Sequence, residues 1–560
     1  MGHIVLPANL ICTFPNASQS ILIKLQFSSY VLNNIEFMVD QIALNNFDYI
    51  IIGLYFVTLL YIGFWGRKKK VDADDLFLTG RSLTWPKIGF SLFSTNVSPM
   101  MLIGFAGLAY SQGIVAANFE WLAWFFLMIL AMVFIPHYQK NKISTMPGFL
   151  DLRYGKKSHT FLSYYSIISI AFIWLGTTLY AGGLIIAQAI GIPIYFSIVG
   201  VAIVALSYTS VGGLAAVVRT DIFQSLLILF GSIVLTILAF IKIGSIDNLY
   251  HGVPPDFWKL FQSSGNSDYP WYAIIFGYAV VAIFFFCIDQ TIVQKVLAAK
   301  SMEHGQKGAL FTSFLKILMP LIFVLPGIMA VVLYPGMENT DEVYLRIVTG
   351  ILPVGMVGMM VAVMLAALIN TIAAGLNSFS TVFTLDIYKK LYPGQSEIRT
   401  KRIGQLMTVM GAVIAMFLAL LFSLADKNLF EISQGLLNFF APPLSVVFLV
   451  GVLWKRATPK AAEITLMGGG AMSVVIGVAY FSDFPYAGFW PNFLILSFYM
   501  FMGLMVFMII MSLLTKPVPE KALPSLIKSQ KARDKNAQRA IWGLWLILAV
   551  IMAGIYIFFN

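Results

Sequence analysis

Long apolar segments recur along the whole of this chain, and they constrain its fold more than any other feature. A helix needs about 20 mostly apolar residues to cross the hydrocarbon core of a bilayer. The sequence contains fourteen such stretches, from residues 48–66 to residues 541–559. Only 11% of the residues are charged, whereas soluble domains average about 25%. The pattern predicts an all-α polytopic membrane protein with about 14 transmembrane helices.

The basic residues indicate how these helices are oriented. If the N-terminus lies outside the cell, the odd-numbered loops are cytoplasmic, and they hold 30 of the 36 Lys and Arg residues. Because Lys and Arg collect in cytoplasmic loops, we expect a multi-pass protein of the plasma or inner membrane with both termini outside. The same distribution explains the net charge of +11 without a nucleic-acid partner. Residues 1–46 then form an extracellular extension, and residues 47–70 contain the first helix.

The second apolar segment, residues 85–110, is interrupted by polar residues and a proline. Five hydroxyl or amide side chains lie from Ser91 to Ser98, and Pro99 follows them. Proline removes a helix hydrogen bond and clashes with the preceding turn. We predict a helix that is broken here, so that its free backbone groups line a cavity or bind an ion. A proline kink satisfied by neighbouring Ser and Thr side chains is the alternative.

Four charged residues fall inside the predicted spans or at their ends: Glu120, Lys316, Asp221 and Asp289. A lone charge at the bilayer centre costs at least about 2.5 kcal/mol, so each needs a partner, a water-filled cavity or a change of protonation state. Asp221 and Asp289 can alternatively reach the cytoplasmic interface from a helix end. We interpret Glu120 and Lys316 as candidates for function.

The apolar segment 351–388 is rich in small and polar residues, among them Asn370, Thr371, Asn377 and Ser378. Such residues allow helices to pack closely, and their oxygens also suit a hard cation. The sequence leaves both uses open.

Several longer stretches carry a specific signature: DLFLTGRSL at 75–83, SYTSVGGLAAVV at 207–218, DQTIVQ at 289–294, AVMLAAL at 362–368, FTLDIY at 383–388, APP at 441–443 and LWKR at 453–456. They resemble the sodium/solute symporter family, specifically its sodium/glucose cotransporter branch, and the similarity runs from about Phe47 to Phe559. The resemblance implies a LeuT-like fold with two inverted repeats of five helices, residues 85–242 and 272–454, followed by three C-terminal helices in residues 460–560. The first helix of each repeat is then broken at mid-membrane, which fits polar interruptions at residues 94–99 and 282–290.

The resemblance also implies a site for Na⁺ as the coupling ion. Its ligands match the backbone carbonyls of Ser94, Val97 and Ala367 and the side chains of Asn370 and Thr371. The family has two serines at the last pair, so Thr371 preserves a hydroxyl whereas Asn370 offers an amide oxygen on a longer arm. Asp221 matches an acidic residue that the family links to cation coupling.

For the solute, the resemblance implies three polar contacts with sugar hydroxyls: Glu120, Lys316 and Gln434. A carboxylate accepts hydrogen bonds and an ammonium donates them, and adjacent hydroxyls need both. Three further sugar-contacting positions depart from the family pattern and carry Met101, Ala282 and Phe285. The Phe285 ring can still stack on a pyranose face and act as an inner gate.

We therefore predict a secondary active transporter that moves Na⁺ together with a small polar solute by alternating access, with a hexose as the leading candidate. Its partners are then the solute, Na⁺ and the lipid bilayer. A polyol such as inositol or another organic solute is the alternative cargo. An uncoupled facilitator or a solute sensor on the same fold are the alternative mechanisms. We do not expect an enzyme, because the sequence shows no nucleophile–base pair, metal-ligand cluster or Gly-rich phosphate loop.

Overall fold

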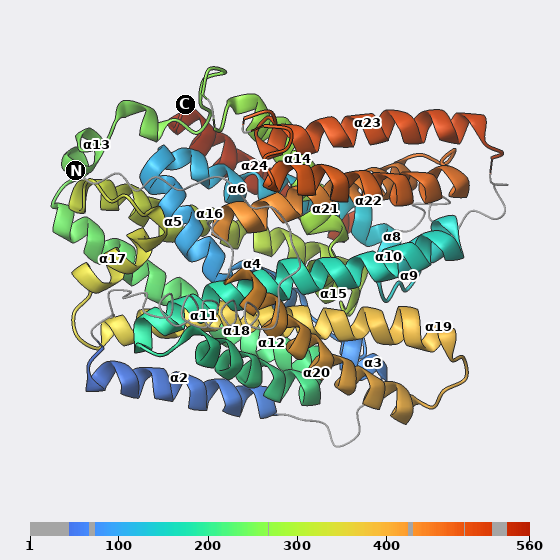
Figure 1. The fold of residues 1–560 in the computed structure, drawn as a ribbon, viewed down its shortest axis with the longest axis horizontal. Coiled ribbons are helices and arrows are strands. Elements are labelled where there is room, and N and C mark those ends of the chain that lie inside the picture. Colours follow the sequence, from blue (N-terminus) through green and yellow to red (C-terminus); the bar gives the residue numbers. More distant parts are fainter. Residues whose placement is uncertain (1–43, 66–72, 267, 424–428, 487, 518–534) are drawn as a thin grey trace, which may run out of the picture.

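The computed structural model describes residues 44–65, 73–266, 268–423, 429–486, 488–517 and 535–560. Within these ranges the regular elements are helices (Figure 1), which confirms the all-α prediction. Among the described residues, eleven helices are long and apolar enough to cross a membrane, or twelve if one bent pair counts as a single span. The predicted extracellular extension falls almost entirely outside the described residues.

The predicted number of fourteen spans is not confirmed, and two features account for the difference. The element α12 (Ile194–Ile243) consists of two helices that meet at a kink at Gly213, where φ is +53°, so it contains both predicted spans 193–210 and 215–242 but is counted once. The predicted span 85–110 is divided into α4 (Trp85–Asn96) and α5 (Pro99–Gln112). Each of these two helices is too short to cross a bilayer alone.

The other long helices are α2 (Asn46–Phe64), α16 (Met302–Leu333), α18 (Met356–Val382), α20 (Glu397–Phe422), α21 (Leu429–Leu453), α22 (Pro459–Phe481), α23 (Phe493–Leu514) and α24 (Lys535–Phe558). Shorter helical segments that position the site are α6 (Asn118–Trp121), α7 (Ala123–Ile129), α9 (Met146–Tyr154), α10 (Lys156–Ser169), η3 (Ile170–Gly176), α11 (Thr177–Ile190), α14 (Tyr278–Ile283), η6 (Phe284–Ile288), α15 (Gln290–Leu297), α17 (Val343–Ile351) and η8 (Phe383–Tyr388).

Both predicted helix breaks are present. Between α4 and α5, Val97 leaves the helical conformation and the Ser98 hydroxyl caps α5 by accepting from the Met101 amide. Pro99 is the first residue of α5, where its missing N–H removes no helix hydrogen bond. Asp289 breaks the second segment between η6 and α15, and its carboxylate caps α15 by accepting from the Thr291 amide at 2.8 Å. The segments on either side of Asp289 are bent by 41°.

Helix α18 forms the centre of the helix packing. Nearly all of its side chains are buried, and it packs against α12, α2, α20 and α11. Small residues permit this close approach: a Cβ at Gly375 would lie 2.8 Å from a methyl of Leu175. In contrast, α22 and α23 lie side by side along the upper edge of the view in Figure 1 and expose many large apolar side chains.

The first described helix begins, and the last described helix ends, on the same face of the molecule. The Asp48 carboxylate at the start of α2 accepts from the Gly358 amide at 2.6 Å, and Gly358 lies at the start of α18. Helix α17, which precedes α18, is joined to the end of α12, because Lys242 donates to the Gly350 carbonyl at 2.8 Å. The loop after α12 in turn meets the C-terminus, where the Leu260 amide donates to the Phe559 carbonyl at 3.0 Å.

Candidate functional site

A buried cavity lies beside the break between α4 and α5. Five of the six solute-binding residues predicted from the sequence line it: Met101, Glu120, Ala282, Phe285 and Gln434. They come from α5, α6, α14, η6 and α21, so the fold brings together residues more than 300 positions apart. The other lining residues are Asn96, Phe105, Phe119, Tyr278, Val281, Phe286 and Leu437. Whether the five contact a solute stays a prediction.

The sixth predicted residue, Lys316, joins this cavity through hydrogen bonds. Its ammonium on α16 donates to the Glu120 carboxylate and to the Asn96 side-chain oxygen. It also lies 5.1 Å from the centre of the Phe286 ring. The side chains of Lys316 and Glu120 are only 1% and 2% exposed. The two charges that needed partners in the sequence are therefore each other's partner.

This ion pair supplies both kinds of hydrogen-bonding group that a hydroxylated solute requires. The cavity is about 30 Å³, which is room for roughly two water molecules and less than a hexose occupies. Solute entry therefore requires the surrounding helices to separate. Asn96 was not among the predicted solute residues, although its place in the polar run before Pro99 was a usable signal.

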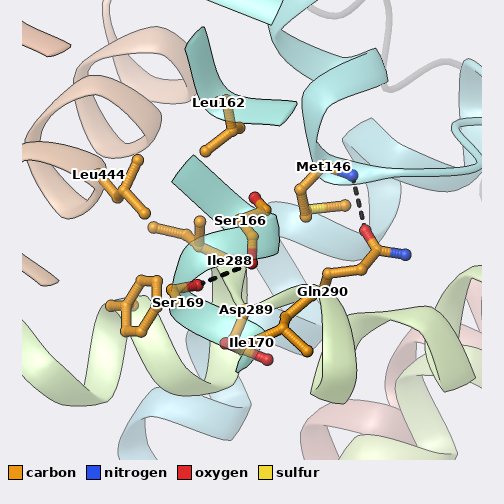
Figure 2. Close-up of a pocket in the computed structure, with 10 residues that line it drawn as sticks. Met146, Leu162, Ser166, Ser169, Ile170, Ile288, Asp289, Gln290 and Leu444 are labelled. Carbon is orange, nitrogen blue, oxygen red and sulfur yellow. Dashed lines mark hydrogen bonds between the residues drawn. The ribbon is translucent and has the colours of Figure 1, made fainter. Parts of the chain in front are cut away.

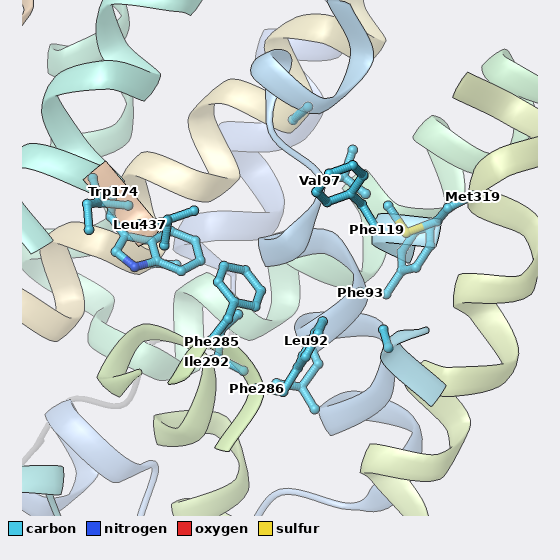
Figure 3. Packing of buried hydrophobic residues seen from close by; sticks show 14 of the residues in the cluster. Leu92, Phe93, Val97, Phe119, Trp174, Phe285, Phe286, Ile292, Met319 and Leu437 are labelled. Atoms are coloured by element: carbon cyan, nitrogen blue, oxygen red, sulfur yellow. The ribbon is translucent and has the colours of Figure 1, made fainter. Parts of the chain in front are cut away.

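Phe285, which lines the cavity, also makes an aromatic contact outside it. The Phe285 ring stacks on Trp174 of η3, with ring centres 5.4 Å apart and planes inclined by 21°, and Figure 3 shows the two side chains beside Leu437. The Trp174 indole donates to the Asp289 carboxylate at 3.0 Å. Trp174 was missed in the sequence, because one aromatic residue in an apolar segment carries no signal.

A second, smaller cavity of about 10 Å³ is lined by Asp289, the residue that accepts from Trp174 (Figure 2). Its polar lining comes from Ser166, Ser169, Asp289 and Gln290. The Gln290 side-chain oxygen accepts from the Met146 amide at 2.9 Å. Trp174 thus connects the Phe285 wall of the first cavity to the Asp289 wall of the second.

The five residues predicted to bind Na⁺ also lie together, where α18 meets the broken end of α4. The Thr371 hydroxyl donates to the Val97 carbonyl at 3.3 Å and to the Ala367 carbonyl at 2.9 Å. The Asn370 amide nitrogen donates to the Ser94 hydroxyl at 2.6 Å and to the Ser94 carbonyl. Carbonyl, hydroxyl and amide oxygens suit a hard cation, so the residue types fit the predicted cargo. Their role as ligands stays a prediction.

Asp221 lies close to this region, one helical turn away along α4. It is fully buried on α12, and its carboxylate accepts from the Ser91 hydroxyl, one helical turn before Ser94 and Thr95. The structure therefore places Asp221 next to the ion region but connects it through Ser91.

Lys295 was counted with the cytoplasmic loops, and this was wrong. It lies inside α15 and is 1% exposed. Its ammonium donates to the Thr95 hydroxyl and to the Thr291 carbonyl, the latter at 3.3 Å. The rule on basic residues counts position along the chain, whereas α15 is buried because α4, α16 and α18 pack against it. Arg153, also counted there, is buried and donates to the Gly451 carbonyl at 2.9 Å.

Comparison with known sequences gives a consistent result. The model of the family described as "Sodium:solute symporter family" matches residues 76–469. The chain is 31% identical to the sodium/glucose cotransporter of Vibrio parahaemolyticus over 91% of this chain and 98% of that protein. It is 31% identical to sodium/glucose cotransporter 4 of Mus musculus, covering 87% and 78% of the two chains. It is 30% identical to sodium/myo-inositol cotransporter 2 of Oryctolagus cuniculus, covering 89% and 81%.

Solved structures show the same architecture. An outward-open, substrate-bound Na⁺-coupled sialic acid symporter matches with a TM-score of 0.75 at 22% identity, over 85% of this chain and 99% of that one. A nucleobase-cation-symport-1 family transporter matches with a TM-score of 0.52 at 14% identity, over 83% and 97%. At these identities the likeness shows the fold, and it confirms the predicted LeuT-like class. The boundaries of the two repeats stay a prediction.

Proposed function

We propose that this chain, which belongs to the sodium:solute symporter family, carries a hexose or a related polyol across the membrane together with Na⁺ by alternating access. The observation that carries this proposal is the buried Lys316–Glu120 pair in a cavity that shares the broken end of α4 with the predicted ion ligands. Relatives named for glucose and for myo-inositol support the same class of solute.

The lining of the cavity suits a molecule with hydroxyls around its edge and C–H groups on its faces. Asn96, Glu120 and Gln434, with Lys316 behind them, supply donors and acceptors for hydroxyls. Phe105, Phe119, Phe285 and Phe286 supply aromatic surface against which an apolar ring face packs. A cargo without hydroxyls would leave the buried ion pair without new partners.

Coupling follows from the short segment that both sites share. Ser94 and Val97 direct backbone carbonyls toward α18, while the Asn96 side chain between them accepts from Lys316 in the solute cavity. A cation that fixes the end of α4 therefore also fixes one wall of the solute cavity. Each inward charge contributes about 2.3 kcal/mol per 100 mV of membrane potential, which is available to accumulate the solute.

In this proposal, the face that carries the start of α2 and the end of α24 is extracellular. The opposite face gathers basic segments that are distant in sequence. There Arg81 donates to the Lys142 carbonyl at 2.8 Å and to the Leu297 carbonyl at 3.1 Å. A cytoplasmic assignment of that face agrees with the tendency of Lys and Arg to stay inside.

The test is uptake into proteoliposomes of labelled hexoses, inositol, sialic acid, proline and acetate, with and without an inward Na⁺ gradient. Na⁺-driven accumulation of a hexose or of inositol is the expected result. Equilibration of a sugar without accumulation would retain the solute site but show an uncoupled facilitator. Uptake of proline or acetate alone would overturn the assignment of the solute.

A further inference from the structure

Four residues form a continuous series of hydrogen bonds that ends on the predicted ion ligands. Lys295 of α15 donates to the Thr95 hydroxyl of α4, and that hydroxyl donates to the Asn370 side-chain oxygen of α18 at 3.5 Å. The Asn370 amide nitrogen then donates to the Ser94 hydroxyl at 2.6 Å and to the Ser94 carbonyl. Each of these side chains is buried to at least nine-tenths.

The ammonium at the start of this series determines the direction of every bond in it. An ammonium has only donors, so the Thr95 oxygen must accept from Lys295. The single hydroxyl hydrogen of Thr95 is then directed to the Asn370 oxygen. An amide that accepts through its oxygen turns its NH₂ group the other way, which here means toward Ser94. The positive end of the amide dipole therefore faces the predicted cation ligands.

A hydroxyl and an amide differ in how readily they change from donor to acceptor. A serine or threonine hydroxyl rotates about one bond and keeps two lone pairs for a cation. Asn370 must turn its whole amide plane before its oxygen faces the site, and this breaks its bonds to Ser94 and Thr95 at once. A cation at Ser94 therefore competes with the Asn370 amide nitrogen, whose orientation is fixed by Lys295 through Thr95.

The charge of Lys295 is offset within the same region. Asp221 and Asp289 are the carboxylates that interact electrostatically with it. Asp221 contacts α4 through Ser91, and Asp289 caps α15 at the helix break. The ammonium thus has its own countercharges and does not need a ligand to balance it.

We propose that Lys295, acting through Thr95, is a positioning residue that holds the Asn370 amide in its donor orientation and so weakens Na⁺ binding at the Ser94 carbonyl. This inference rests on the proposed function, because it takes Na⁺ as the cargo of the site. Sodium binds once the amide has turned over, so the series sets the concentration of Na⁺ at which the transporter responds.

The experiment measures Na⁺-dependent thermal stabilisation of the purified protein, with choline replacing Na⁺ to keep the ionic strength constant. A ligand that binds only the folded state raises the melting temperature with its concentration, so the half-saturating Na⁺ concentration is read without transport. Thr95→Val breaks the series but leaves Lys295 and its two carboxylates in place. We expect this variant to lower the half-saturating concentration about tenfold, which corresponds to about 1.4 kcal/mol. Asn370→Ser, which restores a rotating hydroxyl, should lower it by a similar factor.

Thr408→Val is the matched control, because Thr408 is a buried hydroxyl on α20 that donates to the Gly404 carbonyl at 2.9 Å, outside this region. It should leave the Na⁺ response unchanged. An unchanged or raised half-saturating concentration in Thr95→Val would overturn the proposal, even if Asn370→Ser responds as expected. A wild-type protein without any Na⁺ response would contradict the proposed coupling. In that case Thr95→Val must gain a response, or this inference fails as well.

Discussion

The solute cavity and the ion region both contact the broken end of α4, but they satisfy their buried polar groups in different ways. In the cavity, two opposite charges from α6 and α16 neutralise each other, with Asn96 as a further acceptor. In the ion region, side-chain donors from α18 are placed on backbone carbonyls of α4. The comparison shows that the two ligands must compete with different internal partners. A sugar hydroxyl has to share a carboxylate and an ammonium, whereas a cation has to displace N–H and O–H donors.

The largest effect is expected when the charge balance of the cavity is broken. Lys316→Met leaves Glu120 as a buried charge without its partner, and removing one member of a buried pair costs about 3–5 kcal/mol. We expect solute uptake to fall at least about 100-fold and the melting temperature to drop. Uptake in proteoliposomes and thermal unfolding in detergent measure the two effects.

The double variant Glu120→Gln, Lys316→Met separates these two effects, because it removes both charges. It should recover most of the stability that Lys316→Met loses, since replacing a whole buried pair is often nearly neutral. Its uptake should stay low, because the solute has lost its ionic partners. Normal uptake by either variant would remove Lys316 from the solute site.

The next effect concerns the ion region and sharpens the comparison. Thr371→Ala removes a hydroxyl oxygen that is expected to bind the cation. We expect the half-saturating Na⁺ concentration for uptake to rise about tenfold, as the loss of about 1.4 kcal/mol predicts. Thr371→Ser keeps the hydroxyl and should behave like the wild type. If Thr371→Ala leaves the Na⁺ dependence unchanged, the ion-site assignment is wrong.

A smaller effect is expected at Gln434, a neutral member of the solute cavity. Gln434→Ala removes one side chain that can hydrogen-bond a hydroxyl, and one such bond contributes about 0.5–1.5 kcal/mol. We expect the KM for the solute to rise roughly three- to tenfold while the Na⁺ dependence stays as it is. Equal shifts in both would indicate a structural role for Gln434 rather than contact with the solute.

The smallest effect is expected at the aromatic contact between Phe285, which lines the solute cavity, and Trp174. Phe285→Leu removes the stack on Trp174, and aromatic pairs contribute about 0.5–1.5 kcal/mol beyond the area that they bury. We expect a modest increase in solute efflux without Na⁺, measured on preloaded vesicles. Trp174→Phe retains an aromatic pair and loses only the hydrogen bond to Asp289. A larger leak in that variant would show that this hydrogen bond, rather than the aromatic stack, limits the efflux of solute.

Several features of the fold were predictable because their causes are local. Pro99 and the polar run before it end a helix whatever surrounds them, and the structure has its break there. Glu120 and Lys316 were expected to have compensating partners, because burying an isolated charge in an apolar segment costs free energy. The number of spans was less predictable, because the structure divides the predicted span 85–110 into two short helices, α4 and α5.

The sequence by itself therefore determined the class of protein, the helix breaks and the residue types available at each site. Only the tertiary structure decided which of those residues meet. Lys295 counts as a loop residue along the chain, yet it reaches Thr95, 200 positions away, because α15 packs against α4. The physical reason is that hydropathy and helix breaking act over a few neighbouring residues, whereas hydrogen bonds and ion pairs between helices depend on how those helices pack.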